Sequence, residues 1–73
     1  MWNYPDGIEV QEGDMVSLKE AGGSQFHVKG AIGYVEFDGG NLSVRIYAGA
    51  NDGFGTPASV SVENLEFIQR ASS

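Results

Sequence analysis

The chain contains no cysteine, so neither a disulfide framework nor a cysteine-based zinc site can stabilise it. It has only 4 lysines and arginines against 10 aspartates and glutamates, which gives a net charge of −6. The field of such a protein repels phosphate groups, which argues against nucleic acid and anionic lipid as ligands. We therefore expect no nucleic-acid partner and favour a basic or neutral protein partner.

Long apolar runs are also missing. No stretch approaches the roughly 20 apolar residues that a membrane-spanning helix needs. The first residues, Met1 to Asp6, lack the basic start and the apolar segment of a secretory signal. We expect no membrane span and a cytoplasmic location.

The remaining composition is typical of one small globular domain over residues 1–73. Hydrophobic residues make up 41% of the chain and charged residues 19%, which excludes a disordered tail. A chain this short buries only about 60% of its unfolded surface, which leaves little room for a deep active-site cleft. The 11 glycines separate short apolar runs, and no segment has a helical period, so we expect strands joined by turns.

The clearest element is a period-two strand over residues 42–47, which follows a hairpin turn at residues 38–41. The predicted inward residues are Leu42, Val44 and Ile46, and the predicted outward residues are Ser43, Arg45 and Tyr47. In residues 31–37, strict alternation would place Ile32 and Val35 on opposite faces of the strand. Both resemble core residues, which predicts a bulge at Gly33-Tyr34.

The other predicted strands cover residues 8–10, 15–19, 58–62 and 65–69, with a single tight helical turn at residues 63–64. Two long loops are expected, one over residues 20–29 that Phe26 and Val28 pin to the core, and one over residues 48–57. Residues 1–7 form an N-terminal arm in which Trp2 and Tyr4 cover an apolar edge, and residues 70–73 form a frayed tail. These elements predict an all-β, strongly bent barrel of about five antiparallel strands.

The chain resembles SH3-like barrels of the KOW-like and electron-transport-accessory type through Gly13-Asp14-x-Val16-x-Leu18, Gly30-x-Ile32-Gly33-x-Val35 and Glu63-x-Leu65-x-x-Ile68. The spacing of Phe26, of Val44-Arg45-Ile46 and of Gly53-Phe54 is most similar to the PsaE-like family of photosystem I subunits. This resemblance implies an SH3-like barrel that acts as an accessory subunit. The docking residues of that family are not matched, because Ser24-Gln25-Phe26-His27 stands where an aromatic-rich stretch is expected.

A second resemblance covers both ends of the chain. Tyr4-Pro5-Asp6-Gly7 with Gly13-Asp14, and residues 65–71, are similar to short acidic bacterial proteins of unassigned function. Some of those proteins neutralise or accompany secreted toxins, so the resemblance implies a toxin-immunity-like inhibitor as an alternative function.

An enzyme is the alternative from a different class. Val44-Arg45-Ile46-Tyr47 resembles the Val-Gln-Ile-Tyr strand of type II dihydrofolate reductases, SH3-like barrels whose homotetramer encloses a catalytic pore. In this chain Arg45 replaces the amide, and the loop over residues 48–57 intervenes before the C-terminal strand. An ordinary half-buried strand is therefore the preferred interpretation, and we expect no enzyme.

The chain shows no machinery for nucleophilic catalysis, because it has no cysteine and no serine next to a base. His27 is the only histidine, and a transition metal there would have only carboxylates as further ligands. Asn51-Asp52-Gly53 could hold a hard cation, but a turn explains it better. We expect no catalytic residue, no metal and no cofactor.

Aromatic side chains on or beside loops are the remaining functional signal. The predicted partner-binding residues are Phe26, His27, Tyr34, Arg45, Tyr47 and Phe54. Tyr47 is the strongest interface candidate because alternation places it outward beside Arg45, whereas Phe54 could either plug the barrel or anchor a partner. The sequence thus predicts a non-enzymatic protein-binding module whose acidic surface steers a basic partner, and it leaves weak self-association open.

Overall fold

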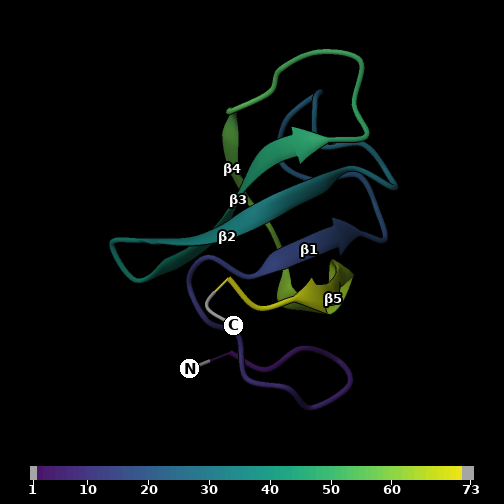
Figure 1. Cartoon of the computed structure of the whole chain (residues 1–73). Coiled ribbons are helices and arrows are strands. Elements are labelled where there is room, and N and C mark those ends of the chain that lie inside the picture. The colour runs from purple at the N-terminus through teal and green to yellow at the C-terminus, as the bar shows by residue number, and fades with distance from the viewer. Residues whose placement is uncertain (1, 72–73) are drawn as a thin grey trace.

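The computed structural model describes residues 2–71, which form a single antiparallel sheet. Its elements are β1 (Met15–Leu18), β2 (Ile32–Asp38), β3 (Asn41–Ala48), β4 (Pro57–Ser59), the 3-10 helix η1 (Val62–Asn64) and β5 (Leu65–Gln69). The strand order is β4-β3-β2-β1-β5, so the last strand returns to pair with the first (Figure 1). The predicted all-β fold of about five antiparallel strands and one short 3-10 turn is confirmed.

The β2–β3 hairpin has the predicted turn. Gly39 and Gly40 have φ angles of 57° and 87°, and a turn with positive φ at both central positions matches the twist of the flanking strands. The turn pairs Asp38 with Asn41 and Val35 with Val44. Alternation then buries Leu42, Val44 and Ile46, as predicted.

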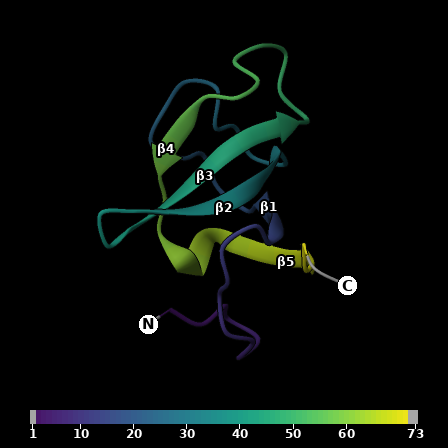
Figure 2. The same ribbon diagram turned by 60° about the vertical axis from the view of Figure 1, so that its left-hand side comes forward.

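Bulges bend the sheet at two places. Between β2 and β3, Ile32 pairs with Ala48 and Gly33 pairs with Ile46, which leaves Tyr47 as the extra residue on β3. Between β1 and β5 a second shift leaves an extra residue on β5 beside Met15. The result is the strong curl of the sheet seen in Figure 2.

The predicted bulge at Gly33-Tyr34 is therefore wrong in position. Strand β2 alternates regularly, with Gly33 and Val35 facing inward, and Ile32 is only half-buried. A Cβ atom at Gly33 would overlap the backbone carbonyl of Arg45 and the side chain of Val44. The inward position of β2 at Gly33 has no side chain, because the backbone of β3 approaches too closely to leave room for one. The apolar pattern of the sequence therefore placed the bulge wrongly.

The core lies on the concave side of the sheet and is almost entirely aliphatic. Its buried hydrophobic residues are Tyr4, Val10, Val16, Leu18, Ala31, Val35, Leu42, Val44, Ile46 and Leu65. Ser43, predicted to face outward, is also buried because β2 and β4 pair on both of its sides. The three buried polar residues, Asp14, His27 and Ser43, are enclosed by this core and therefore need hydrogen-bond partners within the chain.

The N-terminal arm folds back on itself before it reaches the sheet. Tyr4 accepts from the Gly7 N–H at 2.8 Å and donates its own N–H to Ile8 at 2.8 Å, so residues 8–10 return alongside residues 2–4. The predicted strand over residues 8–10 is thus wrong, since only the isolated bridge between Asn3 and Glu9 forms. The predicted covering role of the arm is confirmed, because Tyr4 is buried and Trp2 packs against the core.

A buried carboxylate joins the arm to the start of β1 and the end of β5, two neighbouring strands. Asp14 is fully buried, and its Oδ2 accepts from the Tyr4 hydroxyl at 2.7 Å and from the Gln11 N–H at 2.9 Å. The Nε of Arg70 lies 3.2 Å from Oδ1 as an ion pair, and an Nη of Arg70 donates to the Glu9 carbonyl at 3.1 Å. The predicted frayed tail is therefore wrong at Arg70, and residues 72–73 lie outside the described residues.

Both predicted long loops are present, at residues 19–31 and 49–56, and they lie at the same end of the molecule (Figure 1). Strand β4 is shorter than the predicted 58–62, since it ends at Ser59, and Val62 already belongs to η1. No helix in the part of the chain that the structure describes is long and apolar enough to span a bilayer.

Candidate functional site

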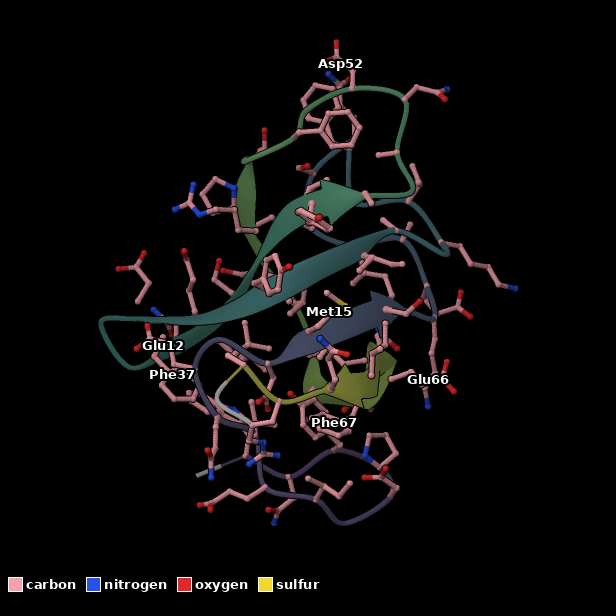
Figure 3. The ribbon with its side chains drawn as sticks, viewed as in Figure 1. Glu12, Met15, Phe37, Asp52, Glu66 and Phe67 are labelled. Atoms are coloured by element: carbon pink, nitrogen blue, oxygen red, sulfur yellow. The ribbon has the colours of Figure 1, made fainter. Side chains whose placement is uncertain are left out.

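The outward surface of the central strands carries two of the predicted aromatic residues, Tyr34 and Tyr47. Met15, Tyr34 and Arg45 form one cross-strand row over β1, β2 and β3, and Figure 3 shows Met15 at the sheet surface. The Tyr34 and Tyr47 rings meet edge to face, with centroids 5.1 Å apart and planes at 60°. Tyr47 nevertheless remains 57% exposed, so one aromatic ring supports another that faces solvent.

Arg45 is fixed in place by three polar contacts. Its Nε and Nη2 donate to the two carboxylate oxygens of Glu36 at 2.8 and 3.0 Å, and its Nη1 donates to the Gly55 carbonyl at 2.5 Å. The hydrogen bonds to the guanidinium lower the pKa of Glu36, and the same bonds raise the pKa of Arg45. The charge of Arg45 is thus locally compensated, and its side chain links β3 to the 49–56 loop.

Phe54 stands on a defined turn within that loop. The Thr56 N–H donates to the Gly53 carbonyl at 3.0 Å, and Gly55 has a φ of 85°, as the third position of a type II turn requires. The Gly55 N–H donates to the Ile46 carbonyl at 2.8 Å, which ties the turn to β3. Because the Phe54 side chain is 58% exposed, the structure answers the question left open by the sequence: Phe54 does not plug the barrel.

Phe26 connects the two long loops. A Cβ atom at Gly53 would overlap the Phe26 ring, which shows that the ring packs directly on the backbone of the second loop. The Phe26 N–H donates to the Ser24 hydroxyl at 3.1 Å, and a hollow of about 260 Å³ beside it is lined by both loops. Phe26 is half-buried and supports the Phe54 turn, so its role is to position that turn.

His27 is not a surface residue, which corrects its predicted role in partner binding. The side chain is fully buried; its Nδ1 lies 2.8 Å from the Ser24 hydroxyl and its Nε2 lies 2.8 Å from the Val44 carbonyl. Phe26 and Val28 are the residues expected to pin this loop, but Val28 is 40% exposed. His27 pins the loop, because both ring nitrogens have partners inside the fold.

The structure brings the rings of Tyr34 and Tyr47 into contact, pairs Arg45 with Tyr34 across the sheet, and joins Arg45 to Gly55, the residue after Phe54. We call the set Tyr34, Arg45, Tyr47 and Phe54 the aromatic face. Phe26 lies behind it and His27 lies in the core. Sequence reasoning missed Glu36, although the two-residue turn at Gly39-Gly40 fixes the register that places Glu36 diagonally opposite Arg45.

Nothing in residues 2–71 gathers three or more metal-ligating side chains. In the polar cluster around Asp14, Oδ2 accepts hydrogen bonds from Tyr4 and Gln11, whereas the buried Oδ1 has only the ion pair with Arg70. Burial, reinforced by the Asp14 carboxylate, raises the pKa of the Tyr4 hydroxyl well above its ordinary value of 10.0, so that this group stays protonated. The cluster therefore has a structural role, which is to hold the N-terminal arm and the residues after β5 together.

No family model matches the chain, and searches of curated proteins and of solved structures found no match either. The functional argument therefore rests on the geometry of the aromatic face and on charge.

Proposed function

We propose that the chain is a non-enzymatic protein-binding module that docks a basic or neutral protein segment on the aromatic face. The observation that carries the proposal is the exposure of two large aromatic side chains, Tyr47 at 57% and Phe54 at 58%, on rigid supports. Tyrosine, phenylalanine and arginine are enriched at protein interfaces, where a few such residues supply most of the binding energy.

Rigid placement of these side chains favours binding. Tyr47 leans on Tyr34, and Phe54 stands on a turn that is held by Arg45 and supported by Phe26. An anchor that is already ordered loses less conformational entropy on association, so more of its contact energy remains as affinity. The aromatic face is therefore suited to binding without rearrangement.

Charge selects the kind of partner. Among residues 2–71, Arg45 and Arg70 form ion pairs with Glu36 and Asp14, and the other eight of the 10 acidic residues form none. A net charge of −6 attracts a cationic segment and repels a second copy of the chain. A partner carrying lysine or arginine beside an apolar side chain fits both the charge and the aromatic face.

The resemblance to SH3-like barrels supports the same proposal, because it implies an accessory module. The proposal includes a cytoplasmic location, and the absence of cysteine suits a reducing compartment. A toxin-immunity-like inhibitor, with a basic toxin as the bound protein, is one form that such a module could take. Nothing in the geometry favours the pore enzyme over this account.

Selection of random peptides on the immobilised protein tests the proposal. We expect the selected peptides to carry net positive charge and an apolar residue, and their affinity to fall about thirtyfold for Tyr47→Ser or Phe54→Ser, the roughly 2 kcal/mol typical of a central anchor. Ile8→Ser is the matched control, because Ile8 is a 39% exposed apolar residue on the N-terminal arm. Peptides whose affinity depends on Ile8 and is indifferent to Tyr47 and Phe54 would contradict the proposal.

A further inference from the structure

The chain contains three Asp-Gly steps, at residues 6–7, 38–39 and 52–53. At such a step the backbone nitrogen of glycine, unhindered by a Cβ atom, can attack the carboxyl carbon of the aspartate side chain. The new C–N bond closes a succinimide ring, and one water molecule leaves. Addition of water to either ring carbonyl then gives back aspartate or yields isoaspartate, so the reaction needs no other reactant.

At two of these steps the structure disfavours ring closure. At the first, the Gly7 N–H donates to the Tyr4 carbonyl at 2.8 Å and Asp6 Oδ1 accepts from the Ile8 N–H at 3.1 Å, so nitrogen and carboxylate are directed to different partners. At the second, Asp38 is paired with Asn41 across the tight turn of the β2–β3 hairpin, which restrains the backbone rotation that ring closure needs.

The third step is arranged differently. The Gly53 N–H donates to Oδ1 of Asp52 itself at 2.7 Å, which brings the attacking nitrogen into contact with the carboxyl group. Asp52 is exposed, and Figure 3 shows its side chain at the tip of the loop, directed away from the sheet. Water and protons therefore have free access to the reacting group.

We propose that Asp52-Gly53 is a site of spontaneous isoaspartate formation in the folded protein, in preference to the steps at Asp6 and Asp38. The rearrangement inserts a methylene group into the backbone next to Gly53, on which the Phe26 ring packs and at which the turn carrying Phe54 begins. Isomerisation at Asp52 therefore disturbs the support of Phe54. The reaction does not depend on the proposed function, because it requires no partner.

Ageing of the pure protein at neutral pH and physiological temperature tests the inference. Peptide mapping with isoaspartate-specific enzymatic methylation measures the product at each step. In the folded protein we expect isoaspartate at residue 52 to exceed that at residues 6 and 38 several-fold, whereas in denaturant the three steps should react at comparable rates. Equal accumulation at all three steps in the folded protein would overturn the inference.

Asp52→Glu supplies the control, because its longer side chain closes a larger ring far less readily; it should remove the signal at this step and leave the other two unchanged. A second readout concerns the loop. The amide resonances of Phe26 and Phe54 should shift in the isomerised fraction, and unchanged resonances would show that the stated effect on the loop is wrong.

Discussion

Replacement of Tyr4 by phenylalanine isolates the hydrogen bond that holds the N-terminal arm to the sheet. The Tyr4 hydroxyl donates at 2.7 Å to Asp14, whose carboxylate is fully buried. Phenylalanine keeps the ring, which lies 5.4 Å from Phe67 between centroids, and removes only the donor. A hydrogen bond to a charged group contributes about 1.5–3 kcal/mol, so we expect the free energy of unfolding to fall by that amount.

For a domain of this size, that loss corresponds to a decrease in Tm of roughly 6–24 °C. Urea denaturation followed by circular dichroism measures the change, and the m-value should stay constant because the surface exposed on unfolding is the same. Tyr47→Phe is the matched control, since Tyr47 is exposed, and its effect should stay within about 0.5 kcal/mol. A Tyr4→Phe protein as stable as the control would refute the role assigned to the Asp14 cluster.

The stability of the same variant relative to wild type should also depend on pH in the alkaline range. Burial and the Asp14 carboxylate raise the pKa of Tyr4 above its ordinary value of 10.0, so the folded state holds the hydroxyl proton more tightly than the unfolded state. This contribution is complete below pH 10 and is lost as the pH rises above it. The stability difference between wild type and Tyr4→Phe should therefore shrink above pH 10, and a constant difference would contradict the assignment.

Two further substitutions test the packing, and one measurement on the wild-type protein tests the assembly state. Gly33→Ala should destabilise the fold by about 1–3 kcal/mol in thermal melts, because the added methyl group meets the backbone of β3. His27→Leu should cost about 1–3 kcal/mol in urea denaturation, because the Val44 carbonyl and the Ser24 hydroxyl both lose a partner. Size-exclusion chromatography with light scattering should give the monomer mass of 7.8 kDa, whereas a stable tetramer would favour the pore enzyme.

The strands and the hairpin could be predicted because their signals are local. The alternation of Leu42, Val44 and Ile46 defines one face of a strand whatever the rest of the chain does. The two-residue turn similarly requires positive φ angles, which glycine adopts readily and other residues avoid. The turn fixes the register of β2 and β3 from Asp38–Asn41 as far as Gly33–Ile46, where the bulge interrupts it.

The errors in the sequence analysis arise where contacts are made between distant segments. The pairing of Asp14 with Tyr4 and Arg70 joins both ends of the chain, and no local pattern marks it. The burial of His27 is not predictable from its loop, because it depends on the Val44 carbonyl across the fold. Exposure of Phe54 likewise depends on how Phe26 and Arg45 fix its loop.

The most direct test of the central claim is a nuclear magnetic resonance titration of the labelled protein with a selected cationic peptide. Binding on the aromatic face predicts that the largest chemical-shift changes fall at Tyr34, Arg45, Tyr47 and Phe54, while the N-terminal arm around Ile8 stays unchanged. Chemical-shift changes confined to the arm or to the edge of β5, with none at the residues of the aromatic face, would contradict the account.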